Sequence, residues 1–254
     1  MFPERAETAM QHLEAAETRG EFDNAGTCQD LTVSLNAVLT GELHDQHLRV
    51  NCIPTESAAD SSRTAKPIAD RYHDFDRMTG ERDNYGVRAV AQLSGNVGYL
   101  RISGFPDGAI IAAPLTHAFA LLQHTDSLIV DVRDNHGGDP QAVALLESYF
   151  FEPWKPRELN EVIARQQSGF DTHQYWTTPV PAGLYYDREV YVLTSSHTIS
   201  AGEGFSYEMQ AEKRATVVGE VTAGAANPAT EILLGDGVMA SIPFGRALNP
   251  VTKT

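Results

Sequence analysis

The chain has 254 residues, enough for one large domain or for a small domain beside a larger one. Its 34 Asp and Glu against 19 Lys and Arg give a formal net charge of -15, which opposes binding to nucleic-acid phosphates and anionic membranes. A hydrophobic fraction of 42% is typical of a globular protein, and no apolar run approaches the roughly 20 residues of a spanning helix. We therefore expect a soluble protein that neither binds nucleic acid nor inserts into a membrane.

The first part of the chain has the pattern of two helices. Pro3 in a first turn and Gly20 beyond the end bound the first one. The second is predicted from the N-cap Thr27 to Gly41, because leucine and valine recur there at helical spacing.

The pattern changes after these helices. Residues 47–53 alternate as in a strand, and the Ser-, Ala- and Pro-rich stretch that follows cannot bury enough apolar surface to order itself. We predict an N-terminal helical domain over residues 1–53, a linker over 54–86 and an α/β core over 87–254.

Within the core, apparent strands and helices alternate. The predicted strands are residues 97–102, 127–132, 189–193 and 215–219, and the predicted helices are residues 109–123, 140–151 and 200–212. This alternation predicts an α/β fold with a mixed, mainly parallel sheet. A Trp- and Pro-rich insertion extends to Tyr186, and Gly235 and Gly237 mark a hairpin that we expect to join the same sheet.

Cysteine usage and the chain ends carry weaker signals. Cys28 and Cys52 lack the CxxC spacing of zinc or dithiol sites, so we expect two ordinary thiols and no metal or cofactor. The first residues lack the basic and apolar regions that are typical of a secretory leader. Because the chain begins inside a helix start and stops without a terminal element, we expect a fragment trimmed at both ends. A lost leader would make the protein periplasmic or secreted.

The ends of two predicted strands are candidate functional sites, because ligands bind at the carboxyl ends of strands in open α/β sheets. The segment from Asp131 to Gly138 (DVRDNHGG) ends on paired glycines whose amides can face an anion, although a tight turn is the simpler interpretation. Ser200 opens a helix, where the Ala201 amide can stabilise negative charge. Ser200 and Glu203 also form the capping-box pattern, so a purely structural role is the simpler interpretation of this turn taken alone.

A serine nucleophile needs a base, and the chain has nine histidines but only four lysines. Lys213 is the sole lysine on the helix that Ser200 opens, and about 20 Å of regular helix would separate the two residues. A serine–lysine dyad is therefore disfavoured. Spacing alone does not choose among the histidines.

Five segments in order resemble the tail-specific or C-terminal-processing serine peptidases, particularly the branch of the tricorn core and the interphotoreceptor retinoid-binding protein modules. They are DQHLRV from Asp45, NVGYLRI from Asn96, DVRDNHGG from Asp131, TISAGE from Thr198 and GEVTAG from Gly219. The resemblance spans nearly the whole chain. It implies a crotonase-like ββα spiral in the core and a serine endopeptidase that acts on peptides or proteins without a cofactor.

The resemblance also implies roles for individual residues. Ser200 would be the nucleophile and His47 the general base. The oxyanion hole would use the amide of Ala201 together with that of Gly137 or Gly138.

Three positions depart from the family patterns. The lysine-dependent branch has its base where this chain has Ala225, so that mechanism is not implied. The tricorn-like branch has a serine where this chain has Gln46, and its supporting glutamate belongs to a segment just past Thr254. We therefore expect the core to continue beyond Thr254 and activity to be impaired without that segment.

The retinoid-binding relatives imply an alternative function, a non-catalytic module for retinoid or fatty-acyl ligands. Its pocket would be lined by aromatic residues of the insertion, namely Trp154, Phe170, Tyr175, Trp176 and Tyr185. A cover over one face of the sheet is the simpler interpretation of these residues.

Overall fold

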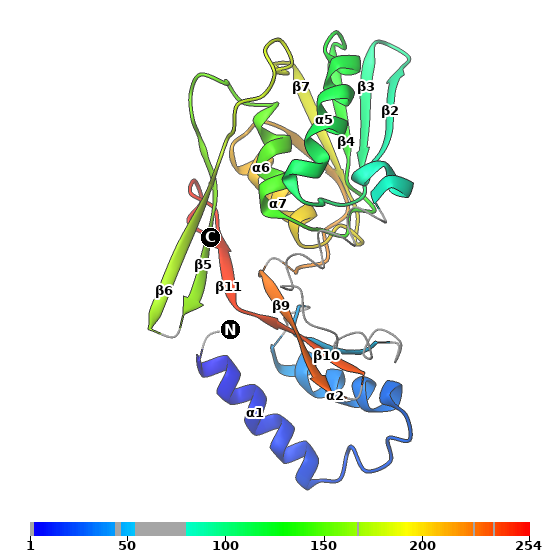
Figure 1. Cartoon of the computed structure of the whole chain (residues 1–254), viewed down its shortest axis with the longest axis vertical. Coiled ribbons are helices and arrows are strands. Elements are labelled where there is room, and N and C mark those ends of the chain that lie inside the picture. The colour runs from blue at the N-terminus through cyan, green and yellow to red at the C-terminus, as the bar shows by residue number, and fades with distance from the viewer. Residues whose placement is uncertain (1–2, 44–46, 54–79, 167, 226, 236) are drawn as a thin grey trace, which may run out of the picture. The chain divides into compact units, whose positions relative to one another are not determined.

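The computed structural model describes residues 3–43, 47–53, 80–166, 168–225, 227–235 and 237–254 (Figure 1). The chain divides into two compact units. The first unit comprises Met1–Lys66, Ile163–Asp171 and Asn227–Arg246, and the second comprises Pro67–Val162, Thr172–Ala226 and Ala247–Thr254. The sequential domain boundaries expected above stay a prediction, and most of the expected linker, residues 54–79, lies outside the described residues.

The first unit begins with two helices, α1 (Pro3–Thr18) and α2 (Cys28–Leu43). Thr27 caps α2 as predicted: its Oγ1 accepts a hydrogen bond from the Asp30 N–H at 3.1 Å, and the Asp30 carboxylate accepts from the Thr27 N–H at 3.0 Å. These bonds satisfy amides at the start of the helix, where no intrahelical acceptor exists.

A three-stranded antiparallel sheet completes the first unit. Its order is β1 (Arg49–Cys52), β10 (Val238–Pro243), β9 (Ala229–Gly235). The β9–β10 hairpin is thus confirmed, but the prediction that it joins the parallel sheet is wrong, since β10 pairs with β1. A small buried cluster explains this choice: Ala240 of β10 packs with Leu48 and Val50 beside the helices.

The prediction that the two cysteines are free thiols is wrong. Cys28, at the start of α2, and Cys52, at the end of β1, are joined in a disulfide with a Cα separation of 6.0 Å. Asn36 reinforces this connection by exchanging two hydrogen bonds of 2.7 Å with the backbone of Val50. The helix-on-strand packing brings the cysteines together across 24 positions, which their spacing alone does not reveal.

The second unit contains a five-stranded sheet. Its strands, in spatial order, are β2 (Val87–Leu93), β3 (Val97–Ile102), β4 (Ser127–Asp131), β7 (Glu189–Thr194) and β8 (Thr216–Gly219). β2 pairs antiparallel with β3, and the other neighbours are parallel. The predicted mixed, largely parallel sheet is confirmed.

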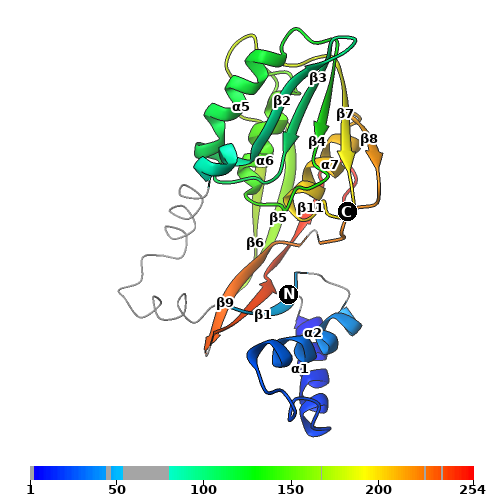
Figure 2. The same ribbon diagram turned by 90° about the vertical axis from the view of Figure 1, so that its right-hand side faces the viewer.

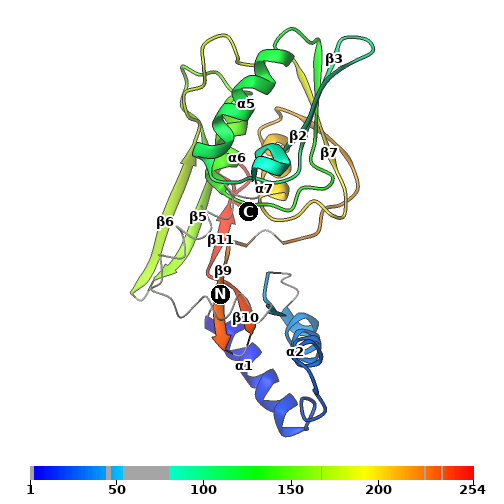
Figure 3. The same ribbon diagram turned by 45° about the vertical axis from the view of Figure 1, so that its right-hand side comes forward.

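Three helices form a layer over one face of this sheet (Figures 2 and 3). They are α5 (Gly108–Leu122), α6 (Pro140–Ser148) and α7 (Ala201–Ala211). Asp107 and Asp139 cap the first two through their carboxylates, and a short 3-10 turn, η2 (Asn84–Gly86), precedes β2. Apolar side chains fill most of the core between the layers, among them Leu100, Val130, Val192, Phe119 and Phe205.

The expected insertion contains strands that the sequence does not reveal. β5 (Glu158–Gln166) and β6 (Gly169–Trp176) form a sheet with β11 (Gly245–Leu248), in the order β11-β5-β6. β6 is exposed at nearly every position, so it lacks the alternation of buried and exposed residues from which a strand is predicted.

Candidate active site

The candidate site lies at the carboxyl ends of β4 and β7. These strands are parallel neighbours whose register ends at Asp131 and Leu193. The loops that follow them therefore leave the same edge of the sheet side by side. One loop carries the paired glycines, and the other leads to Ser200.

Ser200 directly precedes α7 and has a left-handed backbone, with φ 58° and ψ -122°. Such a conformation costs a non-glycine residue about 1–3 kcal/mol and persists only where the surroundings enforce it. The Ser200 N–H donates to the Glu203 carboxylate at 2.9 Å, and the Glu203 N–H donates to the Ser200 carbonyl at 2.9 Å. The capping-box pattern of Ser200 and Glu203 is therefore present at the start of α7.

Gly137 lies against Ser200. A Cβ at position 137 would be 2.7 Å from the Ser200 Cβ, 3.1 Å from its Oγ and 3.2 Å from the Ala201 nitrogen. The structure thus brings together three predicted site residues, and any side chain at position 137 would collide with the serine.

The amides of the two glycines differ in their hydrogen bonding. The Gly137 N–H donates to the Asn135 side-chain oxygen at 2.8 Å, and the Gly137 carbonyl accepts from the Phe105 N–H at 2.8 Å. In the described part of the chain, the N–H groups of Gly138 and Ala201 donate to no acceptor. Gly138 rather than Gly137 therefore has an amide available for a ligand.

Asn135 joins the glycine loop to the serine turn. Its side chain is fully buried, donates to the Ile102 carbonyl at 3.1 Å and accepts from Gly137. Its backbone carbonyl accepts from the Ile199 N–H at 3.0 Å. This role of Asn135 cannot be predicted from the DVRDNHGG segment alone, because its hydrogen-bond partners come from three different segments.

Asp131 anchors the start of the same loop. Its buried carboxylate accepts hydrogen bonds from the Arg133 Nε at 2.9 Å and Nη2 at 2.6 Å, and from the Tyr99 hydroxyl at 2.6 Å. Burial raises the pKa of Asp131, but the bonds from Arg133 and Tyr99 outweigh it and lower the pKa to about 2. The anchor therefore stays ionised at any physiological pH.

Three histidines are candidates for the general base, and they lie in different parts of the fold. His47 is partly buried just before β1 in the first unit, and its pairing with Ser200 stays a prediction. His136 and His197 are exposed in the loops after β4 and β7. Ala225, at the position of the lysine in the other branch, is buried and donates its N–H to Glu203 at 2.8 Å.

A cavity of about 390 Å³ opens beside the glycine loop. Its walls include Tyr85, Phe105, His136, Gly137 and Gly138. A ligand in this cavity would therefore lie against the glycine loop.

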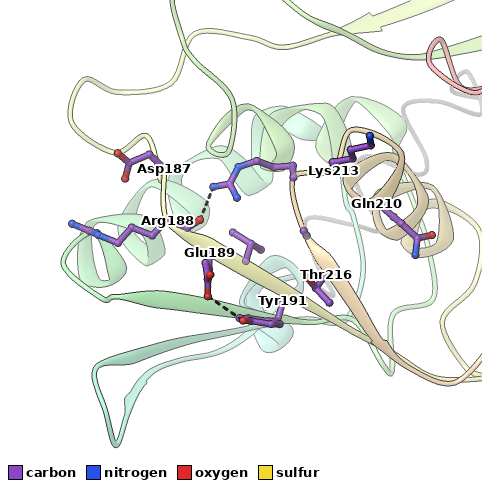
Figure 4. Close-up of a pocket in the computed structure, with 10 residues that line it drawn as sticks. Asp187, Arg188, Glu189, Tyr191, Gln210, Lys213 and Thr216 are labelled. Carbon is purple, nitrogen blue, oxygen red and sulfur yellow. Dashed lines mark hydrogen bonds between the residues drawn. The ribbon is translucent and has the colours of Figure 1, made fainter.

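A second cavity, of about 520 Å³, lies at the amino ends of β7 and β8 (Figure 4). Figure 4 shows Glu189 and Tyr191 side by side, where the Tyr191 hydroxyl donates to the Glu189 carboxylate at 3.0 Å. Although larger, this cavity is separated from the serine turn by the length of β7, about 20 Å for six residues. Its half-buried Arg214 already donates to backbone carbonyls, including that of Arg188 at 2.9 Å, so we place no chemistry there.

The aromatic residues of the expected insertion do not enclose a pocket. Trp154 is 74% exposed, Phe170 61% and Trp176 42%. The lining expected for a retinoid or fatty-acyl site is therefore wrong for these three side chains, because they face solvent.

The described residues contain neither a membrane-spanning helix nor a metal-binding cluster. No described helix combines the length and apolarity needed to cross a membrane. Within the same residues, no cluster of three or more His, Cys, Asp or Glu could hold a metal ion.

The sequence profile of peptidase family S41 matches residues 96–254. The chain belongs to peptidase family S41. The carboxyl-terminal-processing protease of Synechocystis sp. is 31% identical to it over 160 residues, which cover 61% of this chain and 34% of that protein. The S41 chain thus spans about a third of the length of this curated relative. The resemblance to C-terminal-processing peptidases is confirmed.

Solved structures support the fold of this S41 chain. A protein from Parabacteroides merdae superimposes with a TM-score of 0.60 at 23% identity, covering 90% of this chain and 72% of that one. A lipoprotein from Streptococcus agalactiae gives a TM-score of 0.54 at 14% identity, covering 96% and 78%. At these identities the similarity shows the fold alone.

Proposed function

We propose that this S41 chain is a serine endopeptidase that hydrolyses peptide bonds in peptides or proteins, with Ser200 as the nucleophile. The observation that carries the proposal is the contact between Gly137 and Ser200, which sets a strained serine, a helix N-terminus and a glycine loop in one place. This is the arrangement that acyl transfer needs: a nucleophile beside donors for a developing negative charge.

The proposed reaction has two halves. The Ser200 Oγ attacks the scissile carbonyl carbon while His47 takes the hydroxyl proton, and the carbonyl oxygen becomes an oxyanion. The C–N bond then breaks, and the leaving amine receives the proton from His47. Water hydrolyses the resulting ester, giving one proton to His47, and this proton returns to the Ser200 oxygen as the acid product leaves.

The oxyanion would accept hydrogen bonds from the amides of Ala201 and Gly138. Ala201 is the first residue of α7, where the aligned peptide dipoles favour negative charge. Gly138 is preferred to Gly137, because the Gly137 N–H already donates to Asn135.

Two further expectations belong to the same proposal. The Cys28–Cys52 disulfide favours an oxidising compartment, so we propose that the protein is periplasmic or secreted. We also retain the crotonase-like spiral as the detailed topology of the core.

A serine-reactive fluorophosphonate probe tests the proposal on the natural gene product that carries this sequence. We expect one covalent adduct, located on Ser200 by mass spectrometry, and peptide hydrolysis that Ser200→Ala abolishes. Ser196→Ala is the matched control, since Ser196 is an exposed serine in the turn that precedes Ser200. An unlabelled protein, or hydrolysis that survives Ser200→Ala, would refute the proposal.

A further inference from the structure

The carboxylate of Glu203 accepts four hydrogen bonds. One oxygen accepts from the Ser200 N–H at 2.9 Å and the Ala225 N–H at 2.8 Å. The other accepts from the Thr222 hydroxyl at 2.7 Å and the Gly224 N–H at 2.6 Å. The residue is only 8% exposed, so these donors replace water around a buried anion.

This arrangement exceeds the needs of helix capping. A capping box requires one bond from the glutamate to the N-cap amide, here that of Ser200. Three of the four donors instead belong to residues 222–225, the segment that follows β8. A further bond of 3.0 Å, from the Ala223 N–H to the Thr198 carbonyl, holds the same segment to the serine turn.

Ser200 needs such an external constraint. Its left-handed backbone is unfavourable for a residue with a side chain, and its own N–H lies outside the hydrogen-bond pattern of α7. The bond to Glu203 is the one that engages this N–H. Without it, the peptide group before Ser200 can rotate toward an ordinary conformation and carry the hydroxyl with it.

We propose that Glu203 is a positioning residue for the nucleophile, which fixes the main chain of Ser200 and clamps residues 222–225 to the serine turn. The role rests on the proposed peptidase function. Glu203 acts through Ser200 and touches no reacting atom, so its loss lowers the rate of attack while leaving substrate binding intact.

Two variants test this role. In Glu203→Gln, the remaining oxygen can still accept from Ser200 and Ala225 while the NH2 group donates to the Thr222 hydroxyl, so this variant need lose only the bond from Gly224. Glu203→Met keeps the length of the side chain but removes every acceptor. For Glu203→Met we expect the fluorophosphonate labelling rate and kcat to fall about 10- to 100-fold, with KM changed less than about threefold, whereas Glu203→Gln should retain more of the wild-type rate because it can keep the bond to Ser200.

Glu220→Gln is the matched control. Glu220 is exposed and its carboxylate accepts from the Ser196 N–H at 3.0 Å, so it also binds a backbone amide of the turn before Ser200. We expect its labelling rate to stay within twofold of the wild type. Thermal unfolding of all variants separates a positioning defect from loss of the fold.

The outcomes distinguish this inference from the peptidase proposal. If the wild type is labelled and a folded Glu203→Met protein reacts at the wild-type rate, the positioning role is overturned. If the wild type itself is not labelled, the peptidase proposal fails, and crystal structures of the wild type and Glu203→Met then decide the positioning role. Ser200 leaving φ near 58° in the variant supports it, and an unchanged Ser200 overturns it.

Discussion

At the scale of single residues, the site depends on the absence of one methyl group. Position 137 requires glycine for two reasons, a φ of 87° and the 2.7 Å that would separate a Cβ from the Cβ of Ser200. The GG dipeptide can be recognised in the sequence as a turn. The contact with Ser200 cannot, since it joins loops from two different strands.

We expect Gly137→Ala to reduce fluorophosphonate labelling of Ser200 about 100-fold or more, because the new methyl group displaces the nucleophile or the loop. The control is Gly183→Ala, at a glycine with φ 83° and no atom within 4 Å of a Cβ. That change carries the cost of the left-handed backbone alone, about 1 kcal/mol, and leaves labelling unchanged. Equal effects of the two variants would show that strain, not contact, is responsible.

The general base is a second residue-scale prediction. We expect His47→Gln to lower kcat about 10³- to 10⁴-fold, because the Ser200 proton then lacks an acceptor. His136→Gln and His197→Gln, in the loops beside the site, are the comparison variants, measured with the same peptide. Near-normal kcat in His47→Gln, with loss in one of the other two, would move the role of base to that histidine.

At the scale of elements, the periodic patterns were sufficient for most helices and strands. β3 has the predicted bounds, and α1, α5 and α7 differ from prediction by a residue or two at most. The exposed residues of β6 show no period of two, and the buried residues of β5, Leu159 and Val162, are three positions apart, so local alternation predicts neither strand. The β9–β10 hairpin was found, but local alternation contains no information about which sheet it joins.

The disulfide leads to a prediction about α2 and β1. Replacing Cys28 and Cys52 by serine should destabilise the first unit by about 3 kcal/mol, from the closure entropy of a loop of this length. Hydrogen exchange in residues 28–52 should then become faster. Both tryptophans, Trp154 and Trp176, belong to the second unit, so their fluorescence should stay unchanged and serves as the internal control. Unaltered exchange in residues 28–52 would contradict the prediction.

At the scale of the whole molecule, a buried carboxyl pair makes stability depend on pH. Glu147 of α6 and Glu208 of α7 are buried against each other, and neither oxygen of Glu147 has a donor among the described groups. Burial raises the pKa of Glu147 well above its ordinary value, with the nearby carboxyls of Glu208 and Glu212 adding to it. Burial also raises the pKa of Glu208, to about 8. The two carboxyls therefore avoid mutual charge repulsion in the core only while the pair holds a proton. The nearby Glu212 forms an ion pair with Arg157.

The sign of the pH effect follows from these pKa values. The folded pKa lies above the unfolded one, so the folded state holds the extra proton between about pH 4.5 and 8. We expect the free energy of unfolding to be highest at the acid end of this window and to fall as pH rises through it, by up to about 1.4 kcal/mol per pH unit. Urea unfolding between pH 5 and 9 measures the slope.

Glu208→Gln and Glu147→Gln should flatten this dependence, because the amide stays neutral. The exposed Glu220→Gln controls for the loss of one unit from the net charge of -15 and should keep the wild-type slope. A slope that is the same in all three variants would assign the effect to general charge repulsion.

The sequence by itself determined the helices, the parallel strands, the caps at Thr27 and the two candidate loops, because each depends on residues close together in the chain. Its motifs also led to the peptidase family. Only the tertiary structure decided that Cys28 pairs with Cys52, that Gly137 touches Ser200 and that Glu203 collects donors from the segment after β8. These contacts join residues from different elements, and which elements become neighbours is set by the packing of the whole core.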